Sequence, residues 1–193
     1  IVLPGTDDEG NAVTGVAAEA FREKGIVSVE LPSAENFTVG ESAFRGNNIN
    51  EVELNSGITE IGNNSFRDNH LTKVDVTSTV TRIGESAFES NRILEVRFEE
   101  DETKAPSLEA RCFAGNMIQA VEIPKASTSM KGDAFIGNTG KEKVETGTPE
   151  EQSGGVVYVY VNTTGTVPEG LENISNGKSN VQKVMAGQIP AVE

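Results

Sequence analysis

The stretch ITEIGNNSFRDNHLTKVDV, residues Ile58 to Val76, is followed by VTRIGESAFESNRILEVRF, residues Val80 to Phe98, which repeats its pattern. Equivalent residues, such as Phe66 and Phe88, stand 22 positions apart. A fixed period of this length is typical of proteins built from stacked structural repeats. The two stretches therefore predict the architecture of the chain, and their pattern continues on both sides.

Three columns of residues carry the pattern outward. A phenylalanine marks each copy, a small residue precedes it, and an asparagine follows it by three positions except in the first copy, which has Lys24. Apolar residues also recur eight and ten positions after each phenylalanine, and this alternation predicts a short strand with one buried face. Stacked coils would pair these strands in parallel and share one core. The phenylalanines are Phe21, Phe44, Phe66, Phe88, Phe113 and Phe135, and the asparagines are Asn47, Asn69, Asn91, Asn116 and Asn138.

The columns also predict the role of individual side chains. We expect Phe66 and Phe88 to fill the core, and Asn69 and Asn91 to be buried with their amides bonded to backbone groups of the turns. Gly62 and Gly84, which directly follow the apolar residues Ile61 and Ile83, suit a tight bend of the backbone.

These columns resemble the consensus I-G-x-x-[AS]-F-x-x-N-x-[LI]-x-x-V-x-[LIV] of the BspA-like class of leucine-rich repeats, from about Ile1 to Gly140. The resemblance implies a β-rich solenoid, a right-handed stack of about six coils with a parallel sheet on its concave side and short turns opposite. It also implies a bacterial or protist cell-surface protein that binds other proteins or host matrix. Lys24 in place of asparagine and the irregular coil from Phe98 to Phe113 depart from the family pattern.

The C-terminal part of the chain lacks the repeat. We expect a solenoid over residues 1–140 and a C-terminal cap over residues 141–193, with a capping strand at 156–161 and a loose tail. The sequence begins without methionine and within a repeat, so we expect either a mature fragment or a trimmed piece of a longer protein, in which the signal and anchor segments are not present.

The composition excludes several classes of partner. With 30 acidic and 16 basic residues the net charge is −14, which disfavours nucleic acids and anionic membranes. No stretch is apolar enough for direct membrane insertion. The sequence shows neither a nucleophile with a base nor a cluster of metal ligands, so we expect no enzyme, no cofactor and no metal.

The residues that could be reactive or bind metal are expected to have structural or solvent-exposed positions. We expect His70, the one histidine, to be a solvated turn residue, and Cys112 to be a buried, inert thiol. The acidic loops at residues 7–9 and 99–102 could bind calcium, but neither has the alternating oxygen ligands of a known loop, so we expect solvated charges and folding without calcium.

The outward side of the predicted sheet is the candidate site. Side chains seven and nine positions after each phenylalanine should face solvent there, and a protein partner is expected to bind them. Tyr158 and Tyr160 of the capping strand are secondary candidates, which could instead cover the core. The candidates on the concave face are Glu30, Glu51, Glu53, Lys73, Asp75, Glu95, Arg97 and Glu122.

Two functions remain open at this point. The first is a non-catalytic protein-binding or adhesion module of a secreted or cell-surface protein, which displays a curved acidic sheet. The second is a structural spacer or stalk within a larger surface protein. An exposed face that makes ordered contacts would favour the first, and a fully solvated one the second.

Overall fold

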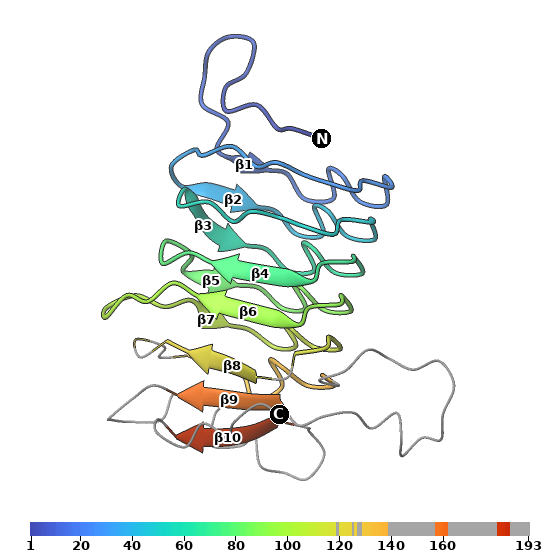
Figure 1. Ribbon diagram of the computed structural model, residues 1–193. Coiled ribbons are helices and arrows are strands. Elements are labelled where there is room, and N and C mark those ends of the chain that lie inside the picture. The colour runs from blue at the N-terminus through green and yellow to red at the C-terminus, as the bar shows by residue number, and fades with distance from the viewer. Residues whose placement is uncertain (119, 125, 127–128, 139–156, 162–180, 186–193) are drawn as a thin grey trace.

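The chain forms a stack of coils with parallel strands (Figure 1). The computed structural model describes residues 1–118, 120–124, 126, 129–138, 157–161 and 181–185 of the 193. No helix occurs in this part of the chain. The parallel β-solenoid predicted from the repeat is therefore confirmed.

One row of strands passes through the apolar residues that lie five positions before the phenylalanines. Each strand in it pairs in parallel with the next, because each coil brings the same segment to the same place. The row, here called row one, consists in order of β1 (Gly15–Val16), β2 (Phe37–Val39), β3 (Ile58–Ile61), β5 (Arg82–Ile83) and β7 (Ser107–Leu108).

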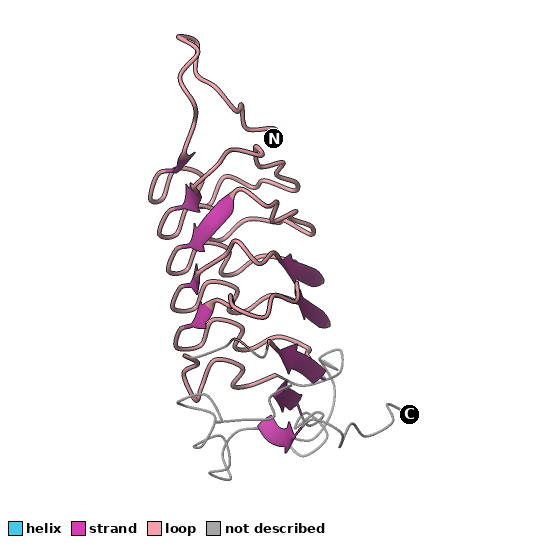
Figure 2. Cartoon of the chain, turned by 90° about the vertical axis from the view of Figure 1, so that its left-hand side faces the viewer, coloured by secondary structure: helices cyan, strands magenta, loops and turns pink. Residues whose placement is uncertain are grey.

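The second row, row two, begins with the three strands expected eight to ten positions after the phenylalanines and continues with two strands nearer the C-terminus. β4 pairs with β6, and β8, β9 and β10 form a separate three-stranded parallel sheet. Figure 2 shows the two rows on opposite sides of the stack. The strands are β4 (Lys73–Val76), β6 (Glu95–Phe98), β8 (Ala120–Ile123), β9 (Val157–Val161) and β10 (Val181–Met185).

The C-terminal strands lie partly where the sequence places them. β9 falls within the segment expected to be a strand, whereas β10 was not anticipated. The expected domain boundary at residues 140–141 lies outside the described residues and stays a prediction.

The repeat phenylalanines form one continuous stack in the turns that lead from row one to row two. Neighbouring rings are nearly parallel, with centroids 5.1–5.5 Å apart and interplanar angles of 2–10°. Phe66 and Phe88 have no exposed surface, as predicted. The stack makes the phenylalanine of one coil the packing surface for the next.

The asparagines form a ladder beside this stack. Asn91 Oδ1 accepts the backbone N–H of Leu71 at 3.0 Å, while Nδ2 donates to the carbonyls of Phe66 at 2.9 Å and Phe88 at 3.1 Å. Asn69 makes the equivalent bonds one coil earlier, and both amides are buried. The predicted bonding of these asparagines to backbone is confirmed. Because two of the three partners belong to the preceding coil, each amide also joins neighbouring coils.

The glycine column has a different cause from the one predicted. Gly62 and Gly84 do not have the positive φ of a tight bend, which occurs instead two positions before and after the phenylalanines, as at Ser86 and Ser90. A Cβ at Gly62 would lie 2.6 Å from the carbonyl oxygen of Val39 in the preceding coil. The glycines are therefore required by the close approach of neighbouring backbones, and the predicted bend was wrong.

Candidate protein-binding face

The eight candidates from the sequence lie at the outward positions of row two. Seven are exposed and Glu95 is half-buried, while the alternate residues Val74 and Val96 are buried in the core. The burial pattern of β4, exposed and buried in turn, shows the alternation directly. We call this surface, with the exposed Ser28, the row-two face.

The two basic residues of the face are paired within it. Lys73 Nζ lies 2.6 Å from the Asp75 carboxylate, and the guanidinium of Arg97 lies 2.7 Å from the Glu95 carboxylate. The parallel register also places Lys73 beside Glu95 and Asp75 beside Arg97, so opposite charges alternate across both strands. These four residues balance one another. In the sequence, this pairing corresponds to two pairs of opposite charges at i and i+2 that stand one period apart.

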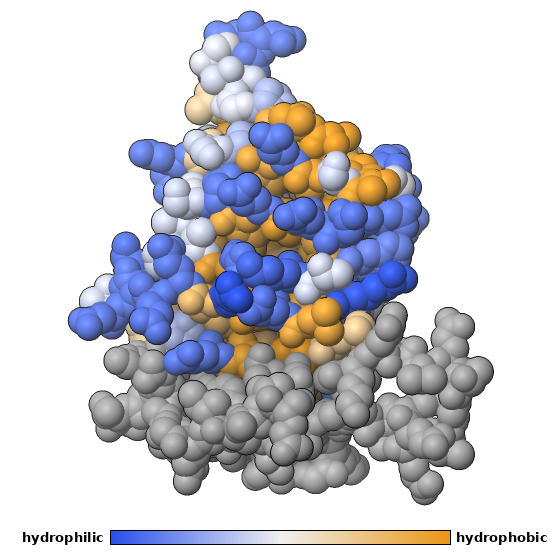
Figure 3. Space-filling model, viewed as in Figure 1, coloured by the Kyte–Doolittle hydropathy of each residue, from blue (hydrophilic) through white to orange (hydrophobic). Residues whose placement is uncertain are grey.

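The remaining carboxylates of the face have no such partner. Glu30, Glu51, Glu53 and Glu122 form no ion pair within 4 Å with any basic group of the described residues. Figure 3 shows hydrophilic residues spread over this side of the stack. The charges on β4 and β6 therefore balance, while the coils before them and the strand β8 after them carry negative charge that is unpaired within the described residues.

The tyrosines can be placed only by their backbone. Tyr158 is the register partner of Ala120, and Tyr160 is the register partner of Glu122. Their side chains lie outside the described residues, so their role stays a prediction.

The acidic loops are held by local hydrogen bonds. The Asp7 carboxylate accepts bonds from the side chain and backbone of Asn11, which lower its pKa. The Asp101 carboxylate likewise accepts bonds from the backbone and hydroxyl of Thr103, and its pKa is lowered. Among the described residues no group of three metal-binding side chains comes together. Independence from calcium stays a prediction.

The lone histidine and cysteine occupy structural positions. His70 is half-buried rather than solvated as expected, and its backbone N–H bonds to the carbonyl of Ile49. Cys112 is fully buried, as predicted, and burial raises the pKa of its thiol, which disfavours the reactive thiolate.

One buried carboxylate, Glu89, was not predicted from the repeat pattern. Glu89 follows Phe88 directly, a position at which earlier copies carry arginine, and it lies between Arg67 of the preceding coil and Arg111 of the following one. Burial raises its pKa most strongly, but the hydrogen bonds from Arg111 and Ser86 and the charge of Arg67 together outweigh burial, so the pKa is lowered. Glu89 thus links three coils as an ionised group. The change of charge sign in this column was the available signal.

Comparison with known proteins identifies the family. The BspA-type leucine-rich repeat region matches residues 14–141 in six copies. The chain belongs to this family. No curated protein matches this BspA-type chain. Among solved structures it is similar to a leucine-rich cell-surface protein from Faecalibacterium prausnitzii A2-165, with 15% identity, a TM-score of 0.44 and 82% of this chain covered. The chain spans 46% of that protein's chain.

The described residues contain no helix that is long and apolar enough to span a bilayer.

Proposed function

We propose that this chain is a non-catalytic protein-binding module of a secreted or cell-surface protein, and that its row-two face binds a basic protein partner. One observation carries the proposal: Glu30, Glu51 and Glu53 project from successive coils without a basic partner among the described residues. Membership of the BspA-type family supports a role in protein binding or at the cell surface, since such solenoids present extended binding surfaces.

The mechanism is rigid display of charge. The coils fix the spacing of the carboxylates, so binding orders little of the module itself and costs little conformational entropy. Unpaired surface charges act mainly on the rate of association, and salt screens them over about 8–10 Å. A basic partner should therefore associate quickly at low salt.

The test reverses two carboxylates that have no partner. Binding of a surface or matrix protein captured by the wild-type chain is followed over a range of salt concentrations. We expect Glu51→Lys with Glu53→Lys to slow association and to flatten its dependence on salt. Glu35→Lys with Glu41→Lys, which changes two exposed acids away from the face, is the matched control.

Each outcome is informative. Unchanged association for the Glu51 and Glu53 double variant contradicts the row-two face as the site. If replacement of Tyr158 and Tyr160 by alanine then abolishes capture, the site lies at the C-terminal strands. If the wild-type chain captures no protein, the spacer function gains support.

A further inference from the structure

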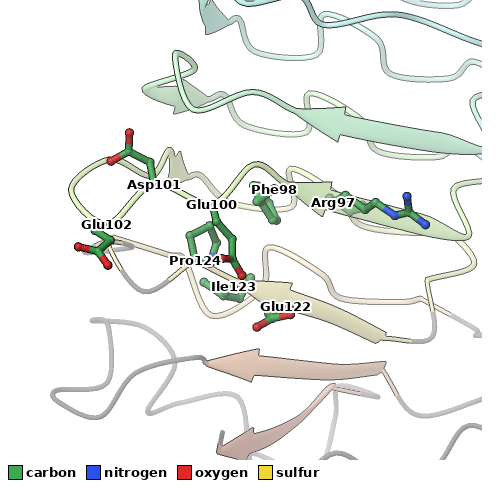
Figure 4. Close-up of a pocket in the computed structure, with 9 residues that line it drawn as sticks. Arg97, Phe98, Glu100, Asp101, Glu102, Glu122, Ile123 and Pro124 are labelled. Atoms are coloured by element: carbon green, nitrogen blue, oxygen red, sulfur yellow. The ribbon is translucent and has the colours of Figure 1, made fainter.

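The row-two strands separate between β6 and β8. β6 pairs with β4 and β8 pairs with β9, but β6 and β8 belong to different sheets. The equivalent residues Val96 and Val121 stand 25 positions apart, whereas Val74 and Val96 stand 22 apart, so this coil carries three extra residues. They lengthen the connection after β6, which forms one wall of a groove of about 440 Å³ between the strand ends (Figure 4). We call it the β6–β8 groove.

The floor of the groove is apolar. Phe98 occupies the inward column ten positions after the repeat phenylalanine, where Leu31, Leu54, Val76 and Ile123 are all buried. Phe98 alone of these five is only partly buried. Its ring packs edge-on against Phe113, at 6.5 Å and 86°, and it lines the groove with Pro124. Phe98 therefore exposes apolar surface to the groove at a repeat position that the other coils bury.

The rim of the groove is acidic and unbalanced. Figure 4 shows Glu100 lying over Ile123 and Pro124, with Glu122 on the adjoining strand. Neither carboxylate forms an ion pair with a base of the described residues. The one base in the lining, Arg97, is held by Glu95, and Asp101 is occupied by Thr103 and Lys104. The groove therefore combines an apolar floor with the carboxylates of Glu100 and Glu122, unpaired within the described part of the chain, and the lining also includes the exposed Glu102, farther out on the connection.

We propose that the β6–β8 groove binds an arginine side chain of the protein partner, with the guanidinium between Glu100 and Glu122 and the aliphatic stem over Phe98. Guanidinium is planar, pairs with carboxylates and stacks on aromatic rings, and the stem of arginine packs on apolar surface. The volume of the groove lies within the range of ordinary ligand pockets. The proposal rests on the proposed protein-binding function and adds the chemistry of the group that the partner inserts.

The probe is N-acetyl-arginine N-methylamide, added to the 15N-labelled chain. Backbone amide shifts of Phe98, Glu100 and Glu122 should change with concentration. The matching citrulline derivative has the same shape without the charge, and it should shift these amides much less. Equal shifts for both compounds, or shifts confined to other coils, would overturn the proposal.

Variants separate the groove from the rest of the face. Glu100→Gln with Glu122→Gln should weaken binding of the arginine probe by about threefold to tenfold, the effect of two exposed ion pairs. The control Glu51→Gln with Glu53→Gln should leave it unchanged. If the probe binds equally well to both variants, the groove is not the arginine site. Failure of the groove leaves capture of a protein through Glu51 and Glu53 intact, so the two proposals fail separately.

Discussion

A ladder asparagine forms hydrogen bonds with buried backbone groups of two neighbouring coils. For Asn91 these are the N–H of Leu71 and the carbonyls of Phe66 and Phe88. An unpaired buried polar group costs about 1–3 kcal/mol. The column is therefore explained by turn chemistry alone and needs no ligand.

Replacing this asparagine should weaken the fold. Asn91→Leu removes these bonds and leaves the N–H of Leu71 without its acceptor, whereas the carbonyls of Phe66 and Phe88 keep the amides of Asn69 and Asn116 as donors. We therefore expect a fall in the urea midpoint that corresponds to about 1–3 kcal/mol, the cost of one unpaired buried group. Asn48→Leu alters an exposed amide and is the matched control. Equal midpoints for the two variants would contradict the structural role of Asn91.

The Glu89 ion pairs should make stability depend on acidity. The pKa of Glu89 is lowered from its ordinary value of 4.5 in the folded chain, so folding favours the ionised form. Its contribution is present above pH 4.5 and is lost as the pH falls through the folded pKa. We expect Glu89→Gln to cost about 2 kcal/mol at pH 7 and progressively less below pH 4.5, as measured by urea unfolding at each pH.

The exposed Glu102→Gln variant serves as the control for other titrating groups. A cost for Glu89→Gln that stays constant between pH 7 and pH 3 would show that charge at this position does not stabilise the fold.

The sequence predicted residues whose role repeats in every coil and missed those whose role arises once. Phe66 and Asn91 recur at a fixed spacing, and their burial followed from that spacing. Glu89 follows three arginines in its column, and its ion pair with Arg111 is formed with the next coil, which is longer than the others. Gly62 was predicted to allow a bend in its own coil. The structure instead requires a glycine there because the backbone of the preceding coil leaves no room for a Cβ.

At the scale of the coil, position in the stack decides the cost of losing a phenylalanine. Phe88 is stacked between Phe66 and Phe113, whereas Phe21 is half-buried and stacks on Phe44 only, among the described residues. We expect Phe88→Ala to cost about 3–5 kcal/mol and Phe21→Ala clearly less. Denaturant midpoints of the two variants check the order, and equal losses would contradict the stacking explanation.

The sequence pattern predicts the repeat strands of row two but not those of row one. Row two has apolar residues at alternate positions, as in β4, which is the usual sign of a half-buried strand. Row one has strands as short as β5 (Arg82–Ile83), with a single buried residue, and so short a segment shows no periodicity. Its strands form because stacking brings equivalent segments together, which is a property of the assembled coils.

For the molecule as a whole, the repeat predicted the solenoid but not the function. The outward positions followed from the period, yet their net charge depends on which carboxylates find a base nearby. The sequence shows Lys73 and Arg97 as positive charges on the face. In the structure Lys73 forms an ion pair with Asp75, and Arg97 forms one with Glu95. The β6–β8 groove lies where one coil carries three extra residues. The repeat pattern shows the insertion but does not show how it changes the spacing of the strands.

The asparagine ladder also sets the order in which the turns of the coils can form all their hydrogen bonds. Asn91 supplies the partner for the N–H of Leu71, which belongs to the preceding coil, and Asn69 does the same for Ile49. On the ribosome the N-terminal coils emerge first, so each turn waits for an asparagine made 20 residues after the amide that it serves. We therefore expect folding during synthesis to lag one coil behind, and nascent chains that end before Asn91 to exchange the Leu71 amide rapidly. Protection of that amide in such chains would contradict this order.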